Sequence, residues 1–132
     1  MKVSAKQDQI KATDEQIYQL ISNPENFAEF LPAQLEQKEC TPDFCRFTIP
    51  GMATLTLRIS EKTPFCKVLY SAENDKNIPI TIDFLIENHS DNSEVEVGIE
   101  AAVPAFLSGM VKNPLQHLAN MIVEKIKLFA EK

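Results

Sequence analysis

The sequence lacks a long hydrophobic run, and its first residues do not predict a secretory signal. Its first residues, MKVSAKQDQ, contain no apolar core of signal-peptide length, and no segment approaches the ~20 apolar residues that a bilayer crossing needs. We therefore expect no membrane span. Cysteine is also scarce, and three cysteines without a secretory signal are typical of reduced thiols in the cytoplasm. These absences together predict a cytoplasmic location.

Basic residues are in short supply too. The chain has 13 Lys and Arg against 19 Asp and Glu, a net charge of −6. A protein that neutralises phosphates carries the opposite balance, so we expect no nucleic-acid partner. Residues 77–111 contain no Lys or Arg at all. Their acidic side chains form either a solvated face or a docking surface for a basic protein partner, with Glu94, Glu96 and Glu100 at outward strand positions.

The composition is otherwise that of a folded globular protein. The 132 residues are 44% hydrophobic and 24% charged, and no repeat, low-complexity tract or linker divides them. A chain of this length suits one domain, which we predict over residues 1–132.

A strand followed by two short helices is predicted at the start of the chain. Residues 2–12 alternate in polarity with a change of parity that indicates a bulge near Gln7–Gln9. Thr13 and Gln16 have the spacing of a capping box. Asn23-Pro24 starts a second helix, since proline suits a first helical turn, and Pro32 closes it.

From residue 35 to residue 104 the hydrophobic period changes to two. This alternation is typical of antiparallel strands with one dry and one wet face, and turn-like segments such as NDKN and HSDNS separate them. With a strand near residues 35–40, we predict six strands after the helices. The apolar positions include Phe47, Leu55, Leu57, Val68, Tyr70, Ile82, Phe84, Val95, Val97 and Ile99.

The C-terminal segment GMVKNPLQHLANMIVEKIKLF is the largest apolar element. Ala105–Lys112 can begin a short helix, after which Asn113 is predicted to cap a main helix with Pro114 in its first position. A helical period places one broad apolar arc over residues 115–130. We expect this arc to cover the dry face of the sheet; it contains Leu115, Leu118, Met121, Ile122, Ile126 and Phe129.

This order of elements resembles the helix-grip fold of the START-like superfamily, also called SRPBCC, which includes the birch-pollen allergen and polyketide cyclase/dehydrase-like proteins. The segments IKATDEQIYQLISNPENFAEFLP, PGMATLTLRI and VPAFLSGMVKNPLQHLANMIVEKI look like their counterparts in small bacterial members. The resemblance implies an α+β fold in which a curved seven-stranded antiparallel sheet wraps around the C-terminal helix. It also implies a cavity for a lipid or another apolar molecule. A ferredoxin-like fold is the alternative, although its helices alternate differently with its strands.

Non-enzymatic binding of a small hydrophobic ligand is the predicted function. Acid/base catalysis needs titratable groups in the pocket, and no inward strand position carries Asp or Glu. A cyclase-type enzyme and a protein-interaction module with a filled cavity are the alternatives. We expect no cofactor and no metal. The predicted lining is Phe27, Phe30, Tyr70, Phe84, Met110, Leu118 and Met121.

Two polar residues of the C-terminal helix are further candidates for the site. His117 lies just outside the apolar arc, either as a flanking interface residue or as a hydrogen-bond donor at the cavity rim. Lys125 lies inside the arc. Its side chain either extends along the sheet to water or anchors a ligand carboxylate.

Cys40 and Cys45 flank the turn-like segment CTPDFC. A turn there places them opposite each other, close enough for a disulfide or a shared metal. Two thiols without a nearby histidine do not make a zinc site, so we expect a reduced hairpin.

Overall fold

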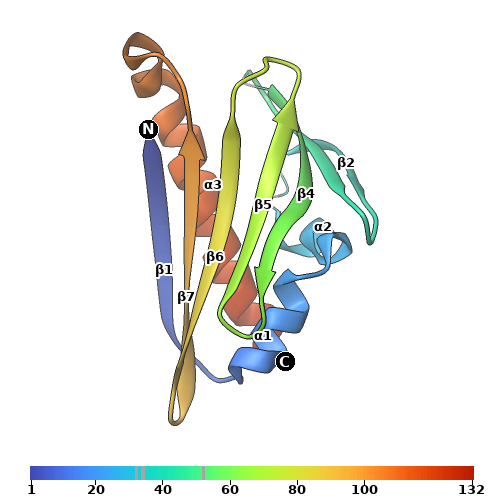
Figure 1. The fold of residues 1–132 in the computed structure, drawn as a ribbon, viewed down its shortest axis with the longest axis vertical. Coiled ribbons are helices and arrows are strands. Elements are labelled where there is room, and N and C mark those ends of the chain that lie inside the picture. Colours follow the sequence, from blue (N-terminus) through green and yellow to red (C-terminus); the bar gives the residue numbers. More distant parts are fainter. Residues whose placement is uncertain (32, 34, 52) are drawn as a thin grey trace.

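A computed structural model describes residues 1–31, 33, 35–51 and 53–132. Its seven strands form one antiparallel sheet in the order β1-β7-β6-β5-β4-β3-β2, which curls around the C-terminal helix α3 (Figure 1). The predicted α+β helix-grip architecture is confirmed. The strands are β1 (Lys2–Ile10), β2 (Glu36–Cys40), β3 (Cys45–Ile49), β4 (Ala53–Thr63), β5 (Lys67–Asn74), β6 (Ile80–His89) and β7 (Asn92–Ala101).

Alternation of side chains gives the sheet a buried concave face. In β6, Ile80, Ile82, Phe84 and Ile86 are buried, whereas the residues between them are exposed or half-buried. Successive strand residues point to opposite faces, so a period of two places the apolar set on one side. Ile78, which continues this spacing, precedes β6 and lies in the β5–β6 turn, where its N–H donates to Asn74.

The predicted bulge in β1 is confirmed. The register between β1 and β7 shifts between Gln7 and Ile10, and Gln9 has a φ of 54°. The extra residue reverses the parity of the strand, so that Val3 before the bulge and Ile10 after it both face the core.

Three short helical elements follow β1: α1 (Asp14–Ile21), the 3₁₀ turn η1 (Pro24–Asn26) and α2 (Phe27–Phe30). The capping box predicted at Thr13 and Gln16 begins α1. Asn23 caps η1 through its side chain, with Pro24 in the first position. Pro32, predicted to close this region, lies outside the described residues.

The long helix α3 (Ala105–Ala130) differs from the prediction, because it is continuous and Pro114 lies inside it. Pro104, not Asn113, occupies the N-cap position. The φ of proline suits a helix interior as well as a first turn. Inside a helix, however, proline has no N–H to donate to the carbonyl four residues earlier, which here is that of Met110. Pro114 is exposed, so water can satisfy that carbonyl and the helix continues.

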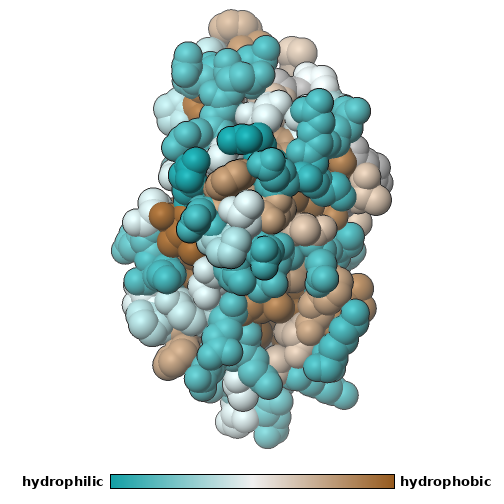
Figure 2. Space-filling model, turned by 90° about the vertical axis from the view of Figure 1, so that its right-hand side faces the viewer, coloured by the Kyte–Doolittle hydropathy of each residue, from teal (hydrophilic) through white to brown (hydrophobic). Residues whose placement is uncertain are grey.

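Two separate covers close the concave face of the sheet. The helix α3 packs mainly against β1 and β7, whereas α1 packs against β5 and β6, and η1 lies near β2 and β4. In Figure 1, α3 runs diagonally behind the sheet and its first turns extend past the start of β1. Seen from the β2 side in Figure 2, hydrophilic side chains break the hydrophobic surface into separate patches. Among the described residues, no helix combines the length and apolarity that a membrane crossing needs.

The β2–β3 hairpin brings Cys40 and Cys45 directly opposite each other, as the turn predicted. Their Cα atoms are 4.0 Å apart and a disulfide joins them. The expectation of a reduced hairpin is therefore wrong, because directly opposed strand positions bring two thiols within bonding reach. Cys66 remains a free, exposed thiol. The cytoplasmic location was inferred in part from reduced cysteines, and the disulfide removes that part of the argument. The location stays a prediction.

Candidate functional site

Four aromatic residues predicted to line the site form one buried cluster under the helices. Phe27 lies at its centre, with ring centroids 5.6 Å from Phe30, 5.0 Å from Tyr70 and 5.6 Å from Phe84. Tyr70 and Phe84 are 5.8 Å apart. Edge-to-face contacts at such distances are favourable for aromatic rings. All four side chains are fully buried, so α2 and the strands β5 and β6 meet through this aromatic cluster.

The Tyr70 hydroxyl is the polar atom of the aromatic cluster. It donates a hydrogen bond of 2.5 Å to the backbone carbonyl of Ile21, the last residue of α1. Burial raises the pKa of Tyr70 far above its ordinary value, because the phenolate would lose its hydration. Tyr70 is therefore a neutral donor that fixes the end of α1 over the sheet.

Two contacts join α2 to α3 beside the aromatic cluster. The Lys125 ammonium donates a 3.2 Å hydrogen bond to the carbonyl of Leu31, which follows the last residue of α2. The rings of Phe30 and Phe129 lie 5.8 Å apart. Lys125 therefore meets neither expectation fully: its half-buried side chain ends on a backbone carbonyl, where a cation is favourable at a helix C-terminus.

The other predicted residues divide between the aromatic cluster and the surface. Leu118 is 3% exposed on the sheet-facing side of α3, and Met121 is half-buried at its edge. Met110 is 73% exposed, so it does not line the interior as predicted. His117, predicted at the helix flank or the cavity rim, is exposed on α3. A helical wheel gives the direction of a side chain but not whether the sheet lies beneath it. It therefore does not show that α3 extends past the sheet at Met110, or that the sheet does not bury His117.

Sequence reasoning assigned Phe129 to the apolar arc but did not place it in the site. Its ring reaches Phe30 because α2 lies against the C-terminal half of α3. Hydrophobic periodicity gave the face of Phe129 but contained no signal for this contact.

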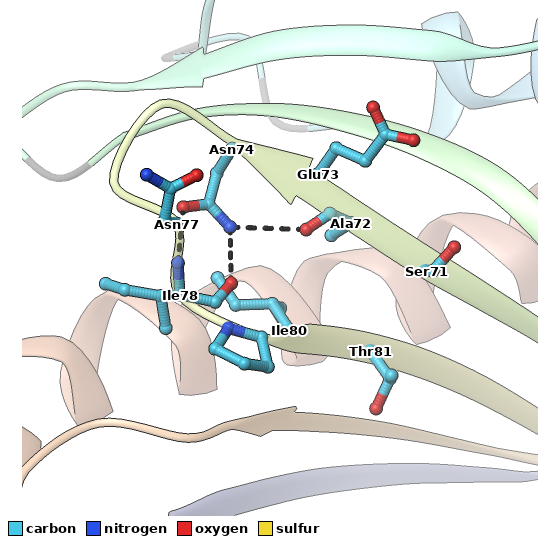
Figure 3. A pocket seen from close by; sticks show the side chains of 9 residues that line it. Ser71, Ala72, Glu73, Asn74, Asn77, Ile78, Ile80 and Thr81 are labelled. Carbon is cyan, nitrogen blue, oxygen red and sulfur yellow. Dashed lines mark hydrogen bonds between the residues drawn. The ribbon is translucent and has the colours of Figure 1, made fainter.

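An open surface pocket lies at the β5–β6 turn (Figure 3). The Asn74 side chain organises this turn: its amide donates to the carbonyls of Ala72 (3.2 Å) and Ile78 (2.6 Å), and its oxygen accepts from the N–H of Lys76 and Ile78. Glu73 faces Arg58 at 3.7 Å. The polar groups of this pocket therefore serve the turn and the sheet surface.

The acidic outer face lies beside basic residues of β1. In the β1–β7 register Lys2 is opposite Glu100 and Lys6 is opposite Glu96, and the Lys6 ammonium lies 3.6 Å from Glu94. The lysines of the first strand thus reduce the negative field of the last strand.

No protein-family model matches the chain, and no curated protein matches it. Solved structures do. A START superfamily protein from Mycobacterium smegmatis aligns with a TM-score of 0.72 and 14% identity over 98% of this chain and 97% of its own. The protein XoxI from Bacillus cereus aligns with a TM-score of 0.71 and 16% identity over 98% and 94%.

A third similar structure is the Aha1 dimer from Colwellia psychrerythraea, with a TM-score of 0.67 and 14% identity over 99% of this chain and 96% of its own. Identities this low establish the shared architecture and not a shared activity. The curled seven-stranded sheet and the long C-terminal helix thus form a helix-grip fold, which this chain shares with the START superfamily protein from Mycobacterium smegmatis.

Proposed function

We propose that the protein binds a small hydrophobic molecule between the concave face of the sheet and its helical covers, without catalysis. The observation that carries this proposal is the aromatic cluster, which is apolar except for one satisfied hydroxyl. Ligand pockets are mostly apolar with few polar groups. The fold supports the proposal by analogy only. The proposed lining is Phe27, Phe30, Tyr70, Phe84, Leu118 and Met121, with Lys125 at the edge.

Entry requires the two helical covers to separate, because the rings are in contact with one another. The contacts that join the covers at this place are the Phe30–Phe129 ring pair and the Lys125–Leu31 hydrogen bond. These two contacts are weak compared with the hydrogen-bonded ladders that hold the strands together. The element that moves is therefore α2, which has only four residues. Lys125 is then available to a ligand carboxylate.

The residues at hand favour binding over catalysis. Among the described residues, no acidic side chain, lysine, arginine or histidine is buried. The Tyr70 hydroxyl is engaged with Ile21, and its raised pKa makes it a poor base at neutral pH. The apolar interior therefore offers shape and hydrophobic contact, which are the requirements of a carrier or sensor.

A direct test is native mass spectrometry of the protein purified from its host. Leu118→Trp fills the proposed space, whereas Leu128→Trp adds the same bulk on the outer side of α3, where Leu128 is 63% exposed. We expect a copurifying lipid or aromatic molecule in the wild type and in Leu128→Trp, and its loss in Leu118→Trp. Thermal unfolding checks that both variants fold, since overpacking costs about 1–3 kcal/mol. Equal retention in both variants would contradict the proposal.

A protein-interaction module is the second candidate, and a specific observation favours it: the rings of the aromatic cluster already fill the space between them. The acidic outer face with Glu94, Glu96 and Glu100 is then the surface for a basic partner. A similar structure is described as a dimer, so self-association is also included. The protein-interaction module is supported if no small molecule copurifies with the protein and the purified protein takes up no hydrophobic probe.

A further inference from the structure

Three metal-ligating side chains meet at the tip of the β6–β7 hairpin. Glu87 and His89 are two residues apart on β6 and so point to the same face, and Glu94 lies directly opposite Glu87 on β7. One ligand atom from each of the three lies within 4.8 Å of the others. The buried neighbours Ile86 and Val95 occupy the other face. The cluster is therefore on the outer face of the sheet, separate from the proposed ligand site.

The backbone beneath these side chains is well fixed. Ladder pairing continues through Glu87–Glu94 and Asn88–Ser93 to His89–Asn92. The fully buried Ser93 donates a 2.7 Å hydrogen bond to the carbonyl of Ala12, which ties the hairpin to the link between β1 and α1. A paired and anchored hairpin holds the three Cα positions, so that only side-chain rotation is needed to bring the ligand atoms together.

Electrostatics at the hairpin favours a cation. Like charges directly opposite on neighbouring strands destabilise a sheet, and Glu87 faces Glu94 in this way. Lys6 lies 3.6 Å from Glu94, but its side chain is 55% exposed and can be displaced. Within the part of the chain that the structure describes, the side chains of Glu87 and His89 make no hydrogen bond or ion pair with another residue. Two of the three donors are thus free for a ligand.

We propose that Glu87, His89 and Glu94 bind a divalent transition-metal ion, with Zn²⁺ as the best fit. An imidazole nitrogen with two carboxylate oxygens suits zinc, whereas magnesium and calcium prefer oxygen ligands alone. Tetrahedral zinc with bonds near 2.0 Å places its ligand atoms roughly 3.3 Å apart, a modest contraction for exposed side chains. Three protein ligands leave a fourth position for water, and the ion crosslinks β6 to β7 while neutralising their opposed carboxylates.

The test is calorimetric titration of Zn²⁺ into EDTA-treated protein, together with ¹H–¹⁵N spectra. A Cys66→Ser background with the Cys40–Cys45 disulfide intact removes competing thiols. We expect one saturable site and chemical-shift changes centred on residues 86–95. His89→Ala and Glu87→Gln should each weaken Zn²⁺ binding at least about tenfold, since loss of even an outer-shell partner of a metal ligand weakens metal binding on that scale.

The chain supplies its own matched control, since its other histidine, His117, is also exposed but lies on α3. His117→Ala should leave Zn²⁺ affinity unchanged, and Mg²⁺ should bind at least about tenfold more weakly than Zn²⁺. The proposal is overturned by the absence of saturable binding, by shifts centred outside the hairpin, or by equal losses in His89→Ala and His117→Ala. Mg²⁺ binding that equals Zn²⁺ binding and survives His89→Ala would show only a general acidic surface, which also overturns it.

Discussion

At the scale of single residues, Tyr70 makes the clearest prediction. Its hydroxyl satisfies the Ile21 carbonyl in the interior, so Tyr70→Phe should lower the free energy of unfolding by about 1–2 kcal/mol, the cost of leaving a buried acceptor unpaired. Urea denaturation at pH 7 measures this. The matched control is Tyr18→Phe, because Tyr18 is half-buried and its ring contact with Phe65 survives loss of the hydroxyl. Equal losses in the two variants would contradict the assigned role.

The same residue predicts a pH dependence. Burial raises the pKa of Tyr70 in the folded state above its ordinary value of 10.0, so the folded protein keeps a proton that the unfolded chain releases. The contribution of Tyr70 is therefore complete below pH 10 and is lost as the pH rises further, by up to about 1.4 kcal/mol per pH unit. Comparison of wild type with Tyr70→Phe between pH 9 and 11 isolates this slope from that of the lysines. Parallel profiles would argue against a buried neutral tyrosine.

Lys125 is predicted to hold α2 against α3. Lys125→Met keeps the apolar stem but removes the donor to Leu31, so we expect a loss of about 1 kcal/mol and faster amide exchange over α2. Lys127→Met is the control. Lys127 makes a surface ion pair with Glu131 at 4.0 Å, and loss of that pair should cost about 0.5 kcal/mol or less, without an effect on α2. Unchanged exchange in Lys125→Met would separate Lys125 from the opening of the site.

At the scale of elements, the continuity of α3 can be tested through the sign of one substitution. If the helix began at Pro114, Asn113 would be its N-cap and Asn113→Ala would cost about 1 kcal/mol. Inside a helix that begins at Ala105, the same change replaces a weak helix former with the best one, so stability should rise by up to about 0.5 kcal/mol. Chemical denaturation gives the sign, and a loss near 1 kcal/mol would restore the interrupted helix.

At the scale of the whole molecule, the acidic side chains of β7 lie beside the lysines of β1. Lys6→Glu changes the net charge from −6 to −8 and replaces an ion pair with repulsion, so unfolding should become easier by roughly 0.5–1 kcal/mol at low salt. Lys62→Glu near the end of β4 makes the same change in net charge away from β7 and should cost less. The difference should shrink at 0.5 M NaCl, where the Debye length falls to about 4 Å. A difference that is independent of salt would point to packing instead of charge.

The sequence by itself determined the elements and their faces. The period of two from residue 35 to 104 predicted the strands and their buried side, and the capping box at Thr13 predicted the start of α1. Even the bulge in β1 was visible as a change of parity. These features are local: they depend on backbone hydrogen bonds and on which side of an element is apolar, and both are encoded within a few residues.

The tertiary structure decided which of those faces meet. Periodicity placed Phe129 in the apolar arc, but only the position of α2 puts its ring against Phe30. It placed Met110 on a helix, but only the length of the sheet leaves Met110 exposed. Contacts of this kind depend on curvature, register and the relative lengths of elements far apart in the chain. No local pattern encodes those distances.

The same division explains the two constellations that sequence reasoning misjudged or missed. Cys40 and Cys45 were predicted to face each other, but their bond depends on Cα positions 4.0 Å apart. Glu87, His89 and Glu94 looked like an exposed turn and part of an acidic run, and only the cross-strand register gathers them within 4.8 Å. The hydrophobic period predicted antiparallel strands with one dry face and a helix to cover it, and the resemblance to the START-like superfamily implied that the sheet curls around that helix. The register and packing of that sheet decided which side chains can act together, because both arise from interactions between segments distant in sequence.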